Sequence, residues 1–192
     1  MANNNTNKIQ TAKVITGKNT RFSYLNCWEP KSIAEGATPK YSVSLIIKKD
    51  SPDVDKIKAA IKVAYTEGLS KLKGNSKAAP ALEALKTPLR DGDLERPDDE
   101  AYKGCYFVNA NSTQAPGIVD AACNPILDHS ELYSGVRGRA SITFYAFNNA
   151  GNKGIACSLN NLQKWFDDEP LGSRATAESD FANSAEDDDF LS

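Results

Sequence analysis

Histidine and closely spaced cysteines are scarce in this sequence, and their scarcity excludes several kinds of site. His129 is the single histidine, and the four cysteines, Cys27, Cys105, Cys123 and Cys157, form no Cys-x-x-Cys pair. A zinc site needs clustered ligands at suitable spacing, and one histidine supplies neither such a cage nor a catalytic triad. We expect free thiols in a reducing compartment, some of them in the core, and a histidine that lies in a loop or packs against a partner.

The sequence also lacks a long apolar segment. No apolar run approaches the roughly 20 residues needed to cross a bilayer, and residues 1–7 (MANNNTN) are too polar for a signal peptide. These absences predict a soluble protein of the cytoplasm with no membrane partner.

Catalytic signatures are missing as well. The chain has no Walker loop, no Gly-x-Ser-x-Gly, no His-Glu-x-x-His and no Gly-x-Gly-x-x-Gly after a strand. The sequence therefore predicts a protein that is not an enzyme and uses no cofactor.

An acidic loop at residues 87–104 keeps one enzymatic alternative open, a metal-dependent nuclease. Its carboxylates are Asp91, Asp93, Asp98, Asp99 and Glu100. The Asp-x-Asp spacing does not continue into a calcium-binding loop, since no Glu follows at the required place. We therefore predict no metal site, and we interpret the loop as a segment positioned by local ion pairs.

Charge is divided unevenly along the chain. The whole sequence has 23 basic and 25 acidic residues, a net charge of −2. Residues 165–192 contain nine acids and one base, so the preceding 164 residues carry 22 bases and 16 acids, a net charge of +6. A basic body joined to an acidic tail suggests a protein that binds a polyanion.

The acidic tail ends in a run of carboxylates followed by an aromatic residue: Glu186, Asp187, Asp188, Asp189 and Phe190. Like charges in a row cannot be buried unpaired, so we expect a solvated tail that either solubilises the protein or recruits a partner. A flexible chain of about 25 residues reaches roughly 25–30 Å, which is enough to fold back onto a small domain. A structural or assembly protein that recruits a partner through this tail, without nucleic acid, is a third class of function that stays open.

The hydrophobic pattern predicts a mainly β fold with one principal helix. Strands are expected at residues 18–28, 40–48, 105–111, 117–119, 137–147 and 155–159, a helix from Val54 to Tyr65, a short helix at 79–86 and a helical turn at 160–165. This order favours an OB-fold barrel with inserted helices over a β-sandwich with a helical insertion. We expect a disordered N-terminus (1–12), one OB-fold domain (13–169) and a disordered acidic tail (170–192).

The clearest predicted strand separates its residues by parity. Small or apolar residues alternate from Val136 to Ala146, whereas the other face carries Arg137, Arg139, Tyr145 and Phe147. Arginines that track phosphates and rings that stack on bases suit single-stranded nucleic acid. The alternative is that the two rings belong to a second core layer with the arginines at its rim.

Other basic and aromatic residues interleave in a similar way. The further candidates for DNA contact are Arg21, Lys40, Tyr41, Phe107 and Lys153. The aromatic residues of the first strand, Phe22, Tyr24 and Trp28, share one parity and are either core residues or stacking platforms.

Several motifs in combination resemble a bacteriophage single-stranded DNA-binding family, formerly a domain of unknown function in phages and prophages. They are residues 133–140 (YSGVRGRA), 147–156 (FNNAGNKGIA) and 159–164 (LNNLQK), with 41–50 (YSVSLIIKKD), 89–93 (LRDGD) and 116–120 (PGIVD). The chain also resembles, more distantly, the replication-associated DNA-binding protein of T7-like phages.

This resemblance implies an OB-fold protein that coats single-stranded DNA with little sequence preference during phage DNA replication or recombination, in the host cytoplasm. It implies that the tail competes with DNA and contacts phage or host replication proteins through Asp187, Asp188, Asp189 and Phe190. This chain ends Phe-Leu-Ser, whereas the T7-type tail ends at the phenylalanine itself. The oligomeric state is left open, a homodimer included.

Overall fold

The computed structural model describes residues 11–172, so the predicted disordered N-terminus and acidic tail lie almost wholly outside the described residues. The strands are β1 Lys13–Ile15, β2 Thr20–Lys31, β3 Lys40–Lys48, β4 Leu89–Asp91, β5 Cys105–Ser112, β6 Gly117–Val119, β7 Arg137–Asn149 and β8 Asn152–Phe166. The helices are α1 Asp53–Glu67, α2 Leu69–Lys73 and α3 Gly92–Glu95, with 3₁₀ turns at Leu82–Ala84, Glu100–Tyr102 and His129–Glu131.

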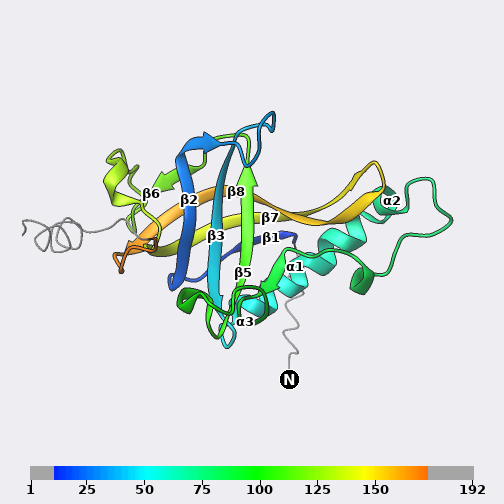
Figure 1. Ribbon diagram of the computed structural model, residues 1–192, viewed down its shortest axis with the longest axis horizontal. Coiled ribbons are helices and arrows are strands. Elements are labelled where there is room, and N and C mark those ends of the chain that lie inside the picture. Colours follow the sequence, from blue (N-terminus) through cyan, green and yellow to red (C-terminus); the bar gives the residue numbers. More distant parts are fainter. Residues whose placement is uncertain (1–10, 173–192) are drawn as a thin grey trace, which may run out of the picture.

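Five of the strands close into a barrel (Figure 1). β2 pairs antiparallel with β3 and β3 with β5; β5 then meets β8 in parallel, β8 pairs antiparallel with β7, and β7 returns to β2. The short strands β1, β4 and β6 extend the sheet at β7, β5 and β8. This closed order is the OB-fold that the sequence predicted, because a β-sandwich would leave two separate sheets.

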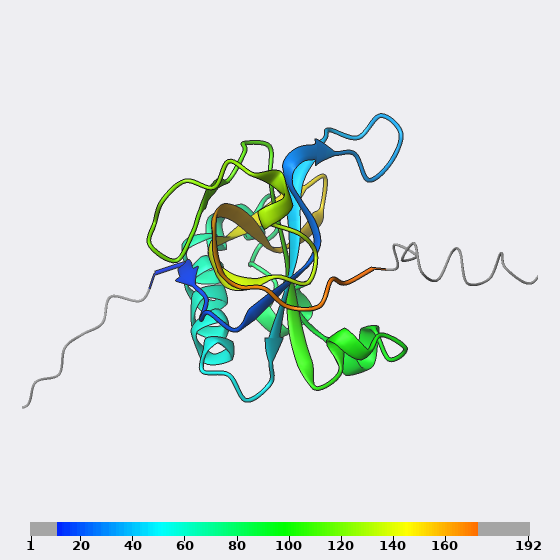
Figure 2. The ribbon, with the colours of Figure 1, turned by 90° about the vertical axis from the view of Figure 1, so that its left-hand side faces the viewer.

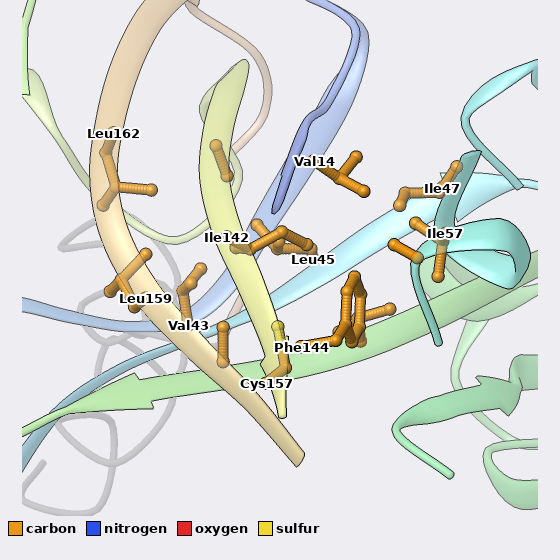
Figure 3. Close-up of a cluster of buried hydrophobic side chains, with 14 of the residues drawn as sticks. Val14, Val43, Leu45, Ile47, Ile57, Ile142, Phe144, Cys157, Leu159 and Leu162 are labelled. Atoms are coloured by element: carbon orange, nitrogen blue, oxygen red, sulfur yellow. The ribbon is translucent and has the colours of Figure 1, made fainter. Parts of the chain in front are cut away.

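Alternate residues of the barrel strands fill its interior with aliphatic and aromatic side chains (Figure 3). They include Phe22, Val43, Leu45, Val108, Ala140, Ile142, Phe144, Leu159 and Leu162, all at most 2% exposed. α1 packs its apolar stripe of Val54, Ile57 and Ile61 onto the same core. Full burial of each large side chain contributes about 1.5–3 kcal/mol, so the buried face of β7 and the apolar stripe of α1, both predicted from the sequence, stabilise the fold together with the other barrel strands.

A long hairpin of β7 and β8 projects from the barrel toward α2 (Figure 1). It turns at Ala150 and Gly151, which both have positive φ, 49° and 89°, as a two-residue turn between twisted strands requires. The sequence predicted a seven-residue loop here and a shorter return strand, because the Asn and Gly residues around the turn also fit a longer loop.

Several elements differ from the sequence-based expectation. The prediction of a helical turn at 160–165 is wrong, since β8 includes these residues and ends at Phe166. The helix predicted at 79–86 is reduced to one 3₁₀ turn. β1, β4 and the short helices α2 and α3 were not predicted, because three to five residues carry too little periodicity to be recognised. These short elements depend on tertiary contacts.

The cysteines are all free, and three of them are buried. Burial raises the pKa of Cys27 to about 12, so its thiol stays protonated. Among the helices of the described chain, none is both long and apolar enough to cross a membrane.

Candidate nucleic-acid interface

The outer surface of β2, β3 and β5 presents side chains in matched rows. Strand register forms three rows across the strands, Arg21–Ile46–Phe107, Ser23–Ser44–Asn109 and Asn26–Ser42–Asn111. Directly opposed residues of antiparallel strands point to the same side, and this side is opposite to the barrel core. We call these three rows, together with the pair Lys31 and Lys40 beyond them, the barrel face.

One end of the barrel face is open and polar. Lys31 and Lys40 are exposed there, and they line a recess of about 270 Å³ together with Ser42 and Asn111. The loop between β2 and β3 forms the rim of this recess and carries Ile33, which is 99% exposed. Lys40, a predicted contact residue, therefore lies where a phosphate could approach.

The other end of the barrel face is covered by residues 92–102. Tyr102 is fully buried and donates a hydrogen bond to the Ser44 hydroxyl at 3.1 Å. Its ring meets Phe107 edge-on, with centroids 5.1 Å apart and an interplanar angle of 87°. Phe107 is 0% exposed, so the expectation that it offers a free ring on this side was wrong. Phe107 lies on the barrel face, but a segment remote in sequence covers its ring.

Tyr24 is the aromatic side chain that β2 exposes beside the barrel face. It has φ +45° at the irregularity between Ser23 and Asn26, and it is 57% exposed. The Arg96 guanidinium lies 5.0 Å from the ring centroid and donates a hydrogen bond to the Tyr24 hydroxyl at 2.9 Å. The arginine thereby orients the ring while leaving much of it open to solvent. Arg96 was not a sequence candidate because it lies in an acidic loop 72 residues away.

The other aromatic residues of β2 are not available. Phe22 is 0% exposed in the core. Trp28 stacks on His129, with centroids 4.2 Å apart and an interplanar angle of 10°, and its indole donates to the Leu132 carbonyl at 3.4 Å. The single histidine is thus packed against a partner, as predicted. Tyr41 has the parity of the core residue Val43 and is half-buried, so it does not point out from the barrel face.

The segment that follows β8, residues 167–171, crosses the covered end of the barrel face, and we call it the strap (Figure 2). Asp168 accepts a hydrogen bond from Arg137 Nε at 2.5 Å and lies 3.7 Å from Arg21 Nε. The hydrogen bond from Arg137 lowers the pKa of this carboxyl group. Leu171 packs on the cluster of Ile46, Tyr102, Cys105 and Phe107.

Two of the arginines predicted to contact DNA, Arg21 and Arg137, therefore bind the strap. Arg21 also donates to the Glu169 carbonyl at 2.7 Å, and Arg137 to the Asn19 carbonyl at 2.9 Å. Gly135 makes room for the crossing, because a Cβ there would lie 2.2 Å from the Glu169 oxygen. These contacts join the two arginines into one site that the sequence alone did not indicate.

The remaining predicted residues of β7 and the hairpin lie elsewhere. Arg139 donates to the Thr16 carbonyl at 3.2 Å, and Phe147 packs its ring over Gly154. Tyr145 is 44% exposed, but eight residues of strand, about 26 Å, separate it from Arg137. The four residues of the predicted line are thus not one compact platform, and Phe147 partly follows the alternative of a second packing layer.

The acidic loop is organised around a lysine. Asp91 and Asp93 both contact Lys49 Nζ, at 2.7 Å in each ion pair. Hydrogen bonds to Asp91 and Asp93 raise the pKa of Lys49, and its ammonium group lowers the pKa of Asp93. Within residues 11–172 there is no group of three or more His, Cys, Asp or Glu side chains that could hold a metal ion. The nuclease alternative therefore finds no ligand set in the loop on which it was based.

Comparison with protein families gives one match over nearly the whole chain. The model of the family described as "Enterobacter phage Enc34, ssDNA-binding protein" matches residues 12–191. No curated protein matches the sequence. The resemblance to a phage family of this kind, inferred from the motifs, is confirmed.

Solved structures of phage single-stranded DNA-binding proteins share the fold. The single-stranded DNA-binding protein of bacteriophage Enc34 in complex with ssDNA has 25% identity and a TM-score of 0.70, over 84% of this chain and 90% of that chain. A C-terminal truncation of that protein has 23% identity and a TM-score of 0.69, over 83% and 88%. The bacteriophage T7 single-stranded DNA-binding protein gp2.5 has 16% identity and a TM-score of 0.58, over 94% and 98%.

Proposed function

Because the chain belongs to the Enterobacter phage Enc34 ssDNA-binding protein family, we propose that it binds single-stranded DNA on the barrel face with little sequence preference. The observation that carries this proposal is the exposed ring of Tyr24, which Arg96 holds beside the barrel face, together with Lys31 and Lys40 at the open end of the same face. OB-folds bind oligonucleotides on this side of the barrel, between the loops that flank it.

The chemistry of the barrel face fits a single strand better than a duplex. Stacking on an aromatic ring requires an unpaired base, and it is worth about 1–3 kcal/mol for any base identity. The lysines supply phosphate contacts that carry no sequence information. The amides of Asn26, Asn109 and Asn111 can hydrogen-bond to base edges or sugars without demanding one base.

We extend the proposal to the acidic tail. The strap lies over the covered end of the barrel face, where Leu171 packs against the cluster that contains Ile46 and Phe107. The chain beyond it therefore starts beside the proposed DNA path, and it contains the run Asp187 to Asp189 followed by Phe190. A polyanion that starts there competes with DNA phosphates for the same lysines. We further propose that the freed tail contacts phage or host replication proteins during replication or recombination in the bacterial cytoplasm.

A direct binding comparison tests the function. Fluorescence polarisation with labelled oligo-dT and with a duplex of equal length should give clearly tighter binding of the single strand by the full-length protein. The affinity should fall steeply with salt, because each phosphate contact releases counterions. Equal affinity for the two DNA forms would refute the proposal.

A further inference from the structure

The hairpin of β7 and β8 forms, together with α2, one end of the molecule (Figure 1). We call this end the arm and define it as residues 69–86 and 145–155. Asn148 Nδ2 donates a hydrogen bond to the Lys71 carbonyl at 2.9 Å, and Lys86 forms a β-bridge to the returning strand of the hairpin. These contacts between remote segments hold the lysines of the arm together.

The arm carries an excess of positive charge. Its lysines outnumber its acids by five to one, a net charge of +4. The lysines are Lys71, Lys73, Lys77, Lys86 and Lys153, and the acid is Glu83. Within residues 11–172, none of these lysines forms an ion pair, whereas Lys164 on β8 pairs with two acids. Unpaired ammonium groups gathered at one end attract an acidic surface.

A shallow recess lies at the base of the arm. It has a volume of about 460 Å³, and its lining includes Lys71, Tyr145 and Ala146. Gly68 lets the backbone approach β7 here, because a Cβ on Gly68 would lie 2.2 Å from the Ala146 Cβ. Glu67 is the one acid of the lining, and the Tyr145 ring is 44% exposed. The recess therefore offers a partly apolar seat beside an unpaired lysine.

The opposite end of the molecule is acidic at its surface. Residues 120–131 contain three acids and no lysine or arginine. Lys164 pairs with Glu131 and Asp167, but its side chain is only 12% exposed, whereas those of the two acids are 49% and 71% exposed. We call residues 120–131 together with Asp167 the acidic end. Its four acids exceed the two nearby bases, Lys164 and Lys18, which lies over the rings at the end of β8.

Leu127 projects from the acidic end and is 86% exposed. The residues on both sides of it are anchored. The Ile126 N–H donates to the Ile118 carbonyl at 3.1 Å, and Asp128 accepts a hydrogen bond from the Ser130 N–H at 2.9 Å. An apolar side chain is thus held out on a fixed loop among acids, and it complements a partly apolar recess among lysines.

The barrel face lies between the two ends. Its rows cross β2, β3 and β5 in that order. Figure 1 shows β2 on the side of the acidic end and β5 on the side of the arm. A DNA strand has a direction, so copies that bind it in the same way all point the same way. A strand that follows the rows would therefore leave one copy beside its arm and meet the next copy beside its acidic end.

We propose that the acidic end of one copy docks on the arm of the next copy along a shared strand, with Leu127 seated in the recess beside Lys71. This inference rests on the proposed function and adds a second copy of this chain as a partner. The contact joins two different surfaces, so it is heterologous and repeats without closing. A row of copies on one strand and cooperative binding are the result.

The contact needs only modest strength. A shared strand holds adjacent copies at an effective concentration in the mM range, so a contact too weak to join two free copies is still formed on DNA. Its charged groups are screened by salt, since the Debye length is about 8 Å at physiological ionic strength. We therefore expect cooperativity that declines as the salt concentration rises.

The test measures cooperativity in two single variants and in their combination. Lys71→Glu places an acid opposite the acidic end, and Leu127→Lys places a cation opposite the arm. The combined variant K71E/L127K brings opposite charges together again. Oligo-dT of about 8 nucleotides spans the site of one OB-fold, whereas about 60 nucleotides hold several copies. The Kd for the 8-mer comes from fluorescence polarisation, and the loading of the 60-mer from sedimentation velocity at sub-saturating protein.

The wild type should favour fully loaded and empty 60-mers over partly loaded ones. Coupled sites typically raise each other's affinity by about 5–150-fold, and we expect a cooperativity factor in this range. Each single variant should reduce the factor to near 1 without changing the Kd for the 8-mer. The combined variant should recover part of the factor, because residues in contact give non-additive effects.

Matched controls make the same charge changes elsewhere. Lys13→Glu on β1 and Leu94→Lys on α3 lie outside both ends, so they should retain the wild-type factor. Wild-type cooperativity in both single variants would overturn the contact, as would losses that simply multiply in the combined variant. Equal losses on the 8-mer and the 60-mer would also overturn it, because the residues would then act within one copy.

The wild type separates this inference from the proposed function. Binding of both strands without cooperativity would overturn the contact between copies and leave the proposed function intact. Binding of neither strand would refute the proposed function and the contact with it.

Discussion

At the scale of single residues, Tyr24 differs from every other aromatic side chain of its strand. Phe22 is buried and Trp28 stacks on His129, but Tyr24 sits at φ +45° and is 57% exposed. A left-handed backbone at a residue other than glycine costs of the order of 1–3 kcal/mol and persists only where its surroundings enforce it. Arg96 supplies part of that enforcement through a hydrogen bond and a cation–π contact. We infer that the strain is retained because it presents the ring.

Replacing Tyr24 tests that inference. Tyr24→Ala should weaken binding of oligo-dT of about 8 nucleotides by the value of one stacked base, about 1–3 kcal/mol, or roughly 5- to 150-fold in Kd. Tyr24→Phe keeps the ring and loses only the hydrogen bond from Arg96, so it should retain most of the affinity. Fluorescence polarisation at constant salt measures both. If the two variants lose equally, the hydroxyl group rather than the ring makes the contact.

At the scale of elements, the sequence predicted the strands that bury one face and missed those that depend on remote partners. The alternation of β7 and the stripe of α1 follow from local periods, and the structure confirms them. The burial of Phe107 could not be predicted, because Tyr102 reaches it from a loop whose composition indicates only charge. Arg137, Arg139, Tyr145 and Phe147 were predicted as one site from strand parity alone. The fold distributes these residues over separate surfaces.

The strap is an element whose position depends on one glycine. Gly135 has φ +119°, and a Cβ there would lie 2.2 Å from the Glu169 oxygen and 2.9 Å from the Leu171 nitrogen. Gly135→Ala should therefore displace the strap and free Arg21 and Arg137 from Asp168. We expect a loss of stability of about 1–3 kcal/mol in chemical denaturation, together with faster proteolysis near residue 170.

The matched control is Gly36→Ala. Gly36 also has positive φ, +78°, but a Cβ there would meet nothing within 4 Å. It therefore reports the cost of backbone strain alone. A Gly135 variant no less stable than the Gly36 variant, with unchanged proteolysis of the strap, would show that the crossing adapts without cost.

At the scale of the whole molecule, charge is arranged around the proposed DNA path. Lys31 and Lys40 stand at the open end of the barrel face, whereas Asp93 and Glu95 lie on the segment at the covered end and Asp91 precedes that segment on β4. The strap adds three acids beside Arg21 and Arg137, and residues 173–192 add six more. A strand bound to the lysines and an acidic tail starting at the strap would thus approach the same surface from opposite ends.

Removing the tail should therefore strengthen DNA binding under conditions where charge matters. Deletion of residues 178–192 removes six acids, and we expect a lower Kd for oligo-dT at about 50 mM salt, where counterion effects are large. The difference should disappear as salt approaches about 1 M, where the Debye length falls to about 3 Å. Substituting Asp187, Asp188 and Asp189 by Asn should reproduce much of the gain at full length, whereas Phe190→Ala should not. Side-by-side isotherms of these proteins decide the matter, because unchanged affinity after deletion would mean that the tail does not compete for the barrel face.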